Sequence, residues 1–405
     1  MVFSILKPRN FRHFFFSDII SGFGVGMSTI GANWFLMDQT GSIQLIGFML
    51  SLNVIAGLVI SPFVGTLTDK FNRKKIILWT NLFRTLGIVA IICLFLIFGF
   101  HTEYLYFFTI INGMSWSIYM SASRSLVQEL LTEKELINGN SLVEISLQVG
   151  MFMAGAASGI LYKYSGFELI LTINAIAFIL SSLFLYRVQY SPIVIDNKEE
   201  TFYANFKNGI TYLKERPYIF WIGVVAIVPL ISTMIYNVVL PGYVTNSVRG
   251  DSVVFGLSDM CYGIGGLISG FIAAPFARKI SKQGTIALFF LLAISSLLAL
   301  AFNKYIFVLY IGSVCIGLSN SSLRILINTT IMETVSKSYM GRALSVWMAI
   351  SLLLQTVFAS GLGVLIERYS AGVGFMCMSV LMLLGFVLYQ LLGSKVKASN
   401  QNLTI

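Results

Sequence analysis

Four ionisable residues lie inside long apolar segments of this 405-residue sequence: Asp18, Arg84, Glu144 and Asp259. An ionisable side chain inside a membrane span costs about 2.5–3.5 kcal/mol on insertion scales, so it usually faces a cavity or a partner. A carboxylate in a desolvated cavity can also exchange a proton near neutral pH. These four residues are therefore the candidates for proton coupling or substrate binding. For Glu144, a position at the membrane interface is an equal alternative.

Asp18 has the most suggestive surroundings. It lies about 10 Å into a helix that starts near Phe11, and Gly22, Thr29 and Asn33 follow on the same face. Such a polar stripe would be misplaced against lipid. Asp18 either takes part in coupling or substrate binding, or pairs with Arg84 as a packing contact.

Asp259 precedes a run of glycines that allow close helix contact. Other polar and aromatic residues in the spans are candidates for lining a cavity: Asn33, Asn112, Trp116, Tyr119, Gln148, Tyr236 and Trp347. The sequence has no phosphate-binding P-loop motif, and its two histidines lack metal-ligand spacing. We expect no cofactor and no metal.

Composition indicates an all-α polytopic membrane protein, because 57% of the residues are hydrophobic and only 11% are charged. The net charge of +10 fits loops that face anionic lipid better than nucleic acid. Spans of roughly 20 apolar residues are predicted at 11–36, 43–65, 76–99, 104–123, 139–161, 168–188, 218–240, 253–275, 283–302, 304–324, 342–364 and 371–393.

The distribution of positive charge predicts that both termini are cytoplasmic. Of 27 lysines and arginines, Arg84 lies within a span and only Lys163, Arg249, Lys304 and Arg368 fall on the opposite side. We expect a multi-pass protein of a bacterial plasma membrane, acting as a monomer in the lipid bilayer.

The chain also contains an internal repeat. Phe71 to Lys74 matches Phe276 to Lys279 at an offset of 205 residues, and other short matches follow in the same order at offsets of 202 to 205. We therefore expect two six-helix bundles, 1–188 and 218–405, joined by a cytoplasmic linker at 189–217.

The most charged stretch is the loop Gly65-Thr66-Leu67-Thr68-Asp69-Lys70-Phe71-Asn72-Arg73-Lys74. It resembles the G-x-L-x-D-R-x-G-R-K signature between spans 2 and 3 of the major facilitator superfamily. Lys70 replaces an arginine and Asn72 a glycine. Parallel six-span repeats are typical of that superfamily, so the resemblance implies the major facilitator fold.

The resemblance implies a gating role for the loop, in which Asp69 meets the inner end of span 11 near Arg342. The repeat suggests ion pairs between Arg73 and Glu129 and between Arg278 and Glu333. The full set of gating candidates is Gly65, Asp69, Arg73, Lys74, Glu129, Arg278, Glu333 and Arg342. Family resemblance also assigns Arg84 a structural role, because third spans support the bundle from outside.

The sequence looks most similar to the drug-efflux branch that includes macrolide-efflux and enterobactin-export proteins. Asp38-Gln39-Thr40-Gly41-Ser42, the loop at 65–76 and Gly341-Arg342 carry this similarity. It implies proton-coupled efflux of amphipathic small molecules by alternating access. Span 5 lacks the proline of the antiporter motif and span 4 lacks its arginine, which leaves proton antiport open.

Three alternatives remain. The protein could export a siderophore or another metabolite, or it could be an importer or uniporter. A membrane enzyme or sensor is disfavoured, because the sequence shows no intramembrane cluster of catalytic residues and no sizeable soluble domain.

Overall fold

Helices make up nearly all of the described chain in the computed structural model, which describes residues 6–132, 135–189, 202–335 and 339–401. The helices are α1 (Arg9–Thr40), α2 (Ile43–Lys70), α3 (Arg73–Phe98), α4 (Thr102–Leu130), α5 (Leu136–Tyr186), α6 (Phe202–Lys214), α7 (Pro217–Gly242), α8 (Ser252–Lys279), α9 (Lys282–Phe302), α10 (Ile306–Thr334), α11 (Met340–Arg368) and α12 (Ala371–Gln401). A π-helical turn, η2 (Tyr243–Val248), continues α7.

These helices supply the twelve predicted membrane spans. In the described residues, ten helices are long and apolar enough to cross a membrane. One of them, α5, is 51 residues long and breaks at Gly166, whose φ of 74° is left-handed, so it contains two spans. The 29-residue α4 is the twelfth span. The short α6 falls within the predicted linker.

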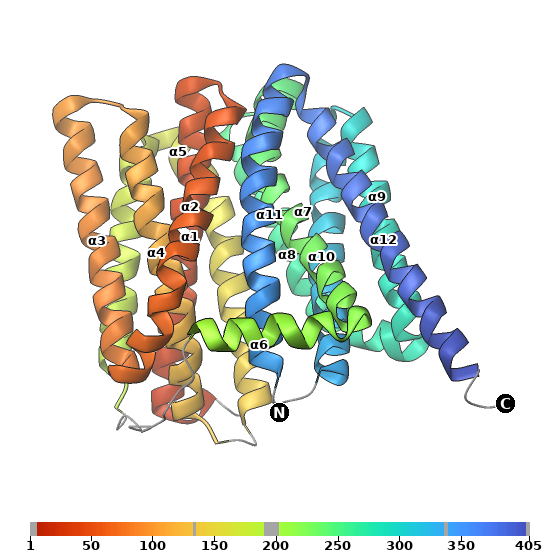
Figure 1. Cartoon of the computed structure of the whole chain (residues 1–405). Coiled ribbons are helices and arrows are strands. Elements are labelled where there is room, and N and C mark those ends of the chain that lie inside the picture. Colours follow the sequence, from red (N-terminus) through yellow and green to blue (C-terminus); the bar gives the residue numbers. More distant parts are fainter. Residues whose placement is uncertain (1–5, 133–134, 190–201, 336–338, 402–405) are drawn as a thin grey trace. The chain divides into compact units, whose positions relative to one another are not determined.

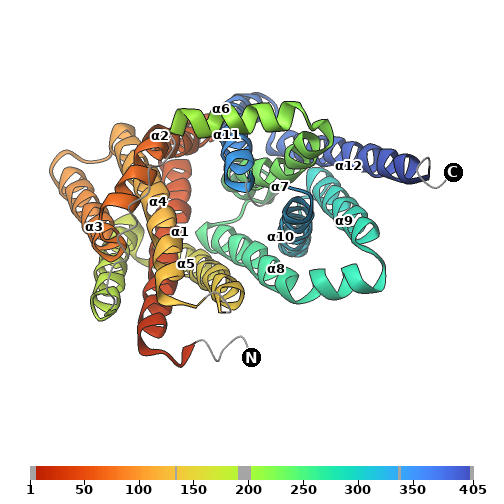
Figure 2. The same ribbon diagram turned by 60° about the horizontal axis from the view of Figure 1, so that its bottom comes forward.

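The contacts divide the chain into two compact units. Unit 1 contains residues 1–198 and 250–263, so it comprises α1 to α5 and the first part of α8. Unit 2 contains residues 199–249 and 264–405. Within unit 1, α1 to α5 run side by side, whereas α6 lies across the long helices of unit 2 (Figures 1 and 2).

Local chemistry explains how the charged loop starts α3. The side chain of Asn72 accepts a hydrogen bond from the backbone N–H of Lys75 at 3.1 Å, which caps the first turn of the helix. Asn72 is also where the sequence departs from the family signature, so the substitution supplies a helix cap. Ser281 caps α9 in the same way by accepting from Gly284 at 3.0 Å.

Glycine allows α1 and α5 to approach closely. A Cβ added to Gly150 would lie 2.5 Å from the carbonyl oxygen of Ile19 and 2.6 Å from the nitrogen of Phe23. Gly22 faces the same crossing, with the backbone of Leu147 opposite it. Since lipid tails are as apolar as leucine, close packing of small residues is a main source of helix association in a membrane.

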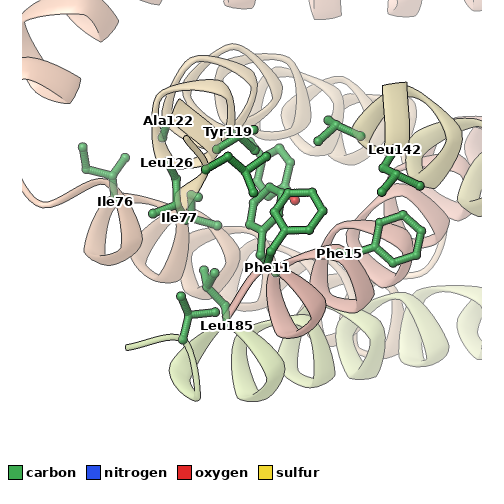
Figure 3. Close-up of a cluster of buried hydrophobic side chains, with 14 residues drawn as sticks. Phe11, Phe15, Ile76, Ile77, Tyr119, Ala122, Leu126, Leu142 and Leu185 are labelled. Carbon is green, nitrogen blue, oxygen red and sulfur yellow. The ribbon is translucent and has the colours of Figure 1, made fainter. Parts of the chain in front are cut away.

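An apolar cluster fills the interior of unit 1 where α3 begins and α4 ends (Figure 3). Phe11 and Phe15 of α1 meet Ile77 of α3 and Leu126 of α4, and Leu185 of α5 packs beside them. Tyr119 belongs to this cluster, although its ring carries a hydroxyl group. The apolar cluster therefore includes one polar group, the Tyr119 hydroxyl.

Candidate functional site

Asp18 is held by two hydroxyl groups inside unit 1. The Tyr119 hydroxyl donates a hydrogen bond to Asp18 Oδ1 at 2.6 Å, and Ser146 Oγ donates to Asp18 Oδ2. Asp18 and Tyr119 are each only 1% exposed. Both lie about ten residues, or roughly 15 Å, from the helix ends at the predicted cytoplasmic side. The α1–α5 crossing at Gly150 brings Ser146 within reach of Asp18.

Arg84 of α3 lies over the ring of Tyr119. Its guanidinium carbon is 5.5 Å from the centre of the Tyr119 ring and 4.9 Å from that of Phe178. The side chain is 1% exposed, and within the described residues none of its nitrogen atoms donates a hydrogen bond. Arg84 and Asp18 thus share Tyr119, and Arg84 makes cation–π contacts in place of the packing ion pair considered from the sequence.

Asp259 occupies a different setting, also in unit 1. It is partly exposed, and no hydrogen bond to its carboxylate is found within the described part of the chain. It lies against α5, because a Cβ added to Gly155 would be 3.0 Å from Asp259 Oδ2. Gly159 and Gly256 extend this close approach, and Ser252 Oγ donates to the Gly159 carbonyl at 2.9 Å.

The charged loop is tied to two other helices of unit 1. Arg73 forms the predicted ion pair with Glu129 at 2.8 Å, and both side chains are only 8% exposed. Lys74 Nζ donates to the carbonyl oxygens of Tyr186 and Val188 at 2.8 and 2.7 Å, so it caps the end of α5. The two basic residues of the motif therefore hold α4 and α5 against the start of α3.

The second predicted ion pair is wrong. Glu333 pairs with Lys282, at the start of α9, instead of with Arg278. The reason is that α9 begins at Lys282 and α8 extends as far as Lys279, which places Arg278 in the last turn of α8. Lys282 and Glu333 are 33% and 59% exposed, so this pair is far more hydrated than its counterpart.

Among the described residues of unit 2, the buried polar residues are uncharged. Tyr236 of α7 shares a 2.7 Å hydrogen bond with Ser313 of α10. Asn320, also on α10, is 3.4 Å from Thr233 Oγ1 and 3.5 Å from Ser232 Oγ. Trp347 is buried on α11 and donates to the Phe220 carbonyl at 3.3 Å.

The remaining predicted site residues are dispersed. Asn33 is buried on α1, Asn112 and Trp116 are partly buried on α4, and Gln148 is partly buried on α5. Arg278 is exposed and Arg342 partly so. Glu144 and Asp69 have side chains that the structure does not describe, and the surroundings of Gly65 are not described either. The predictions for these three residues remain predictions.

Several contacts were not predicted from the sequence. Ser146 binds Asp18, and Lys163 Nζ forms an ion pair with Asp251 at 2.7 Å. This bond from Lys163 lowers the pKa of the Asp251 carboxyl below its ordinary value. Asp18 and Tyr119 each lie about ten residues from the predicted cytoplasmic end of their helix. Comparing the depths of polar residues in the predicted spans could therefore have indicated this contact. No local pattern connects Lys163 with Asp251.

The fold, with its twelve spans and buried charges, is that of a multi-pass membrane transporter. The family model of the Major Facilitator Superfamily matches residues 14–234 and again 223–403. The chain therefore belongs to the Major Facilitator Superfamily, which is a family of transporters and not of enzymes.

Individual relatives agree with this assignment. A protein of Bacillus amyloliquefaciens named as a bacilysin exporter is 26% identical over 300 residues, covering 71% of this chain and 72% of the relative. Macrolide efflux protein A of Streptococcus pyogenes is 20% identical over 346 residues, covering 82% and 84%. The crystal structure of a bacterial homologue of the iron transporter ferroportin, in its inward-facing state, shares the fold with a TM-score of 0.77 at 15% identity, over 96% of this chain and 99% of that one.

Proposed function

We propose that this protein exports amphipathic small molecules across a bacterial plasma membrane by alternating access, driven by proton entry. The relatives named as exporters and efflux proteins support the direction of transport. They do not identify the coupling ion, so proton coupling depends on the chemistry of unit 1.

One observation carries the proton-coupling part: α5 contacts two membrane-embedded carboxylates at different depths. Ser146 of α5 binds Asp18, and Gly155 of α5 lies against Asp259. Nine residues separate these two contacts, which is about 13 Å along a helix. A carboxylate inside a membrane is costly, so two of them beside one helix indicate an ion pathway more than a packing device.

The two carboxylates suit different roles. Both oxygens of Asp18 accept bonds from buried hydroxyl groups, so protonation there would disrupt existing hydrogen bonds. Asp259 is partly exposed and accepts no side-chain hydrogen bond within the described residues. A proton can therefore reach Asp259 without breaking a bond. We assign proton exchange to Asp259 and a positioning role to Asp18.

The test begins with a compound panel in a strain that lacks its own efflux pumps. A compound whose accumulation falls when the protein is expressed is then measured in inside-out vesicles, with and without a pH gradient. We expect gradient-driven transport in the wild type and transport that no longer responds to the gradient in Asp259→Asn. Glu333→Gln is the control, because it removes an exposed carboxylate from unit 2 and should keep the gradient response.

Transport by Asp259→Asn that still follows the pH gradient would remove this residue as the coupling site. Gradient-independent transport by the wild type would instead refute proton coupling and favour a uniporter.

A second candidate is export of a natural-product metabolite. The relative named as a bacilysin exporter has the higher identity of the two relatives described above, which favours this class over a macrolide. The panel should therefore contain bacilysin beside macrolides. The compound whose accumulation falls more when the protein is expressed identifies the favoured class.

A further inference from the structure

Helix α6 differs from all the long helices of unit 2 in its direction and its contacts. It lies across them and packs against α11 (Figures 1 and 2). Gly209 makes the closest contact, because a Cβ there would collide with the backbone carbonyl of Arg342 and lie 3.0 Å from Val346 Cγ2. This contact fixes α6 onto the start of α11.

Stacked rings reinforce that attachment. The Tyr212 ring of α6 stacks on Tyr339, which caps α11, with ring centres 4.5 Å apart and planes 11° from parallel. A guanidinium covers each end of the stack: Arg216 lies 4.4 Å from the Tyr212 ring centre, and Arg342 lies 5.3 Å from that of Tyr339. The stack therefore holds two cations beside α6.

The exposed face of α6 combines apolar and basic side chains. Ile210 is 45% exposed, and Lys207 and Lys214 are exposed as well. At about 100° per residue, these three positions fall within roughly 60° of one another on the helix. The opposite side, with Gly209 and Tyr212, is buried in unit 2. An apolar edge beside lysines is typical of a helix that lies in the membrane interface.

We propose that this face of α6 binds the headgroups of anionic phospholipids. Ile210 enters the boundary of the acyl chains, while Lys207 and Lys214 contact the phosphates. The cations are spread along the helix and over both ends of the ring stack, so they match an extended anionic surface better than a single small anion. The predicted position of α6 on the cytoplasmic side agrees, because that leaflet attracts basic segments next to membrane spans.

The test is native mass spectrometry of the purified full-length protein titrated with phosphatidylglycerol or phosphatidylcholine. Because each basic residue near an anionic surface adds to the attraction, Lys207→Gln/Lys214→Gln should weaken phosphatidylglycerol binding by about tenfold or more. Binding of phosphatidylcholine should stay unchanged. Ile210→Ser should weaken the binding of both lipids.

The matched control is Lys279→Gln/Lys304→Gln, which removes two exposed lysines elsewhere in unit 2 and should retain phosphatidylglycerol. Equal losses in both double variants would overturn the proposal, because attraction by net charge alone would then suffice. Unchanged phosphatidylglycerol binding in the α6 variant, or unchanged binding of both lipids in Ile210→Ser, would also overturn it. Displacement of the lipid by inorganic phosphate would point to a small-anion site and reject a lipid surface.

Discussion

Units 1 and 2 contain short matching stretches of sequence, yet they fill their interiors with different chemistry. In unit 1, buried Asp18 binds Tyr119, and Arg84 covers the same ring. The position 204 residues after Tyr119 is Leu323, and the position 205 residues after Arg84 is Phe289. Both are buried and apolar. The buried polar contacts described in unit 2, such as Tyr236 with Ser313, involve no charge.

This difference shows that the repeated fold does not require buried charge. Replacing a buried ion pair by well-packed apolar residues is often neutral or stabilising, so charged groups in a bundle are weak contributors to folding. Unit 2 already has apolar residues, Leu323 and Phe289, at the positions that correspond to Tyr119 and Arg84. The charges that unit 1 retains are therefore better explained by function, and the following variants test that contrast.

The largest effect is expected from Asp18→Leu. The change removes two hydrogen bonds to a buried carboxylate and leaves the Tyr119 hydroxyl without its acceptor, so it should lower the free energy of unfolding by about 3–5 kcal/mol. Ser313→Ala removes a neutral partner in unit 2 and should lower it by about 1 kcal/mol. Thermal unfolding of the detergent-solubilised protein measures both, and equal losses would refute the contrast between the units.

The ion pair Arg73–Glu129 of unit 1 should also contribute more to stability than the pair Lys282–Glu333 of unit 2. Glu129→Gln breaks a pair that is 8% exposed on both sides, so we expect a loss of about 2–4 kcal/mol. Glu333→Gln breaks the hydrated pair with Lys282, for which at most about 1 kcal/mol is expected. Raising the salt concentration should reduce the second loss more than the first. A first loss that vanished in high salt would show that the Arg73 pair is hydrated after all.

Two glycines test how tightly each unit is packed. Gly150→Ala places a methyl group against the backbone of α1, whereas Gly223→Ala places one against the Trp347 indole. Each should cost roughly 1–3 kcal/mol. Only the second should be relieved by a smaller partner, so Trp347→Leu should restore stability to Gly223→Ala. Failure of that rescue would mean that the crossing in unit 2 is also limited by backbone contact.

The smallest effect concerns pH. Because bonding to Lys163 lowers the pKa of Asp251, this pair stabilises the folded protein above the ordinary aspartate pKa of about 3.9. That contribution is lost as the pH falls through the lower, folded-state pKa. Both side chains are nearly half exposed, so solvent screens the pair and its contribution to stability should be small. The difference in melting temperature between wild type and Asp251→Asn should accordingly shrink as the pH falls below the ordinary aspartate pKa, and a constant difference would contradict the pairing.

Much of the fold could be predicted from the sequence, because membrane spans and positive loops are read from composition and the repeat orders them. Ion pairs were harder to predict. Arg73 with Glu129 followed from the repeat, but Lys282 replaced Arg278 because α9 starts a turn beyond its expected partner. Asp18 was identified from its cost in a membrane. Its partner Ser146 was not, because a serine in an apolar helix carries no signal until the helix crossing is known.

Proton release on substrate binding tests the central claim most directly. The purified protein is placed in weakly buffered detergent solution with a pH indicator, and a transported compound from the panel is added. We predict that wild type and Glu333→Gln release protons near neutral pH, whereas Asp259→Asn binds the compound and releases none. Proton release by Asp259→Asn equal to that of the wild type would contradict the assignment of Asp259 as the residue through which unit 1 couples protons to transport.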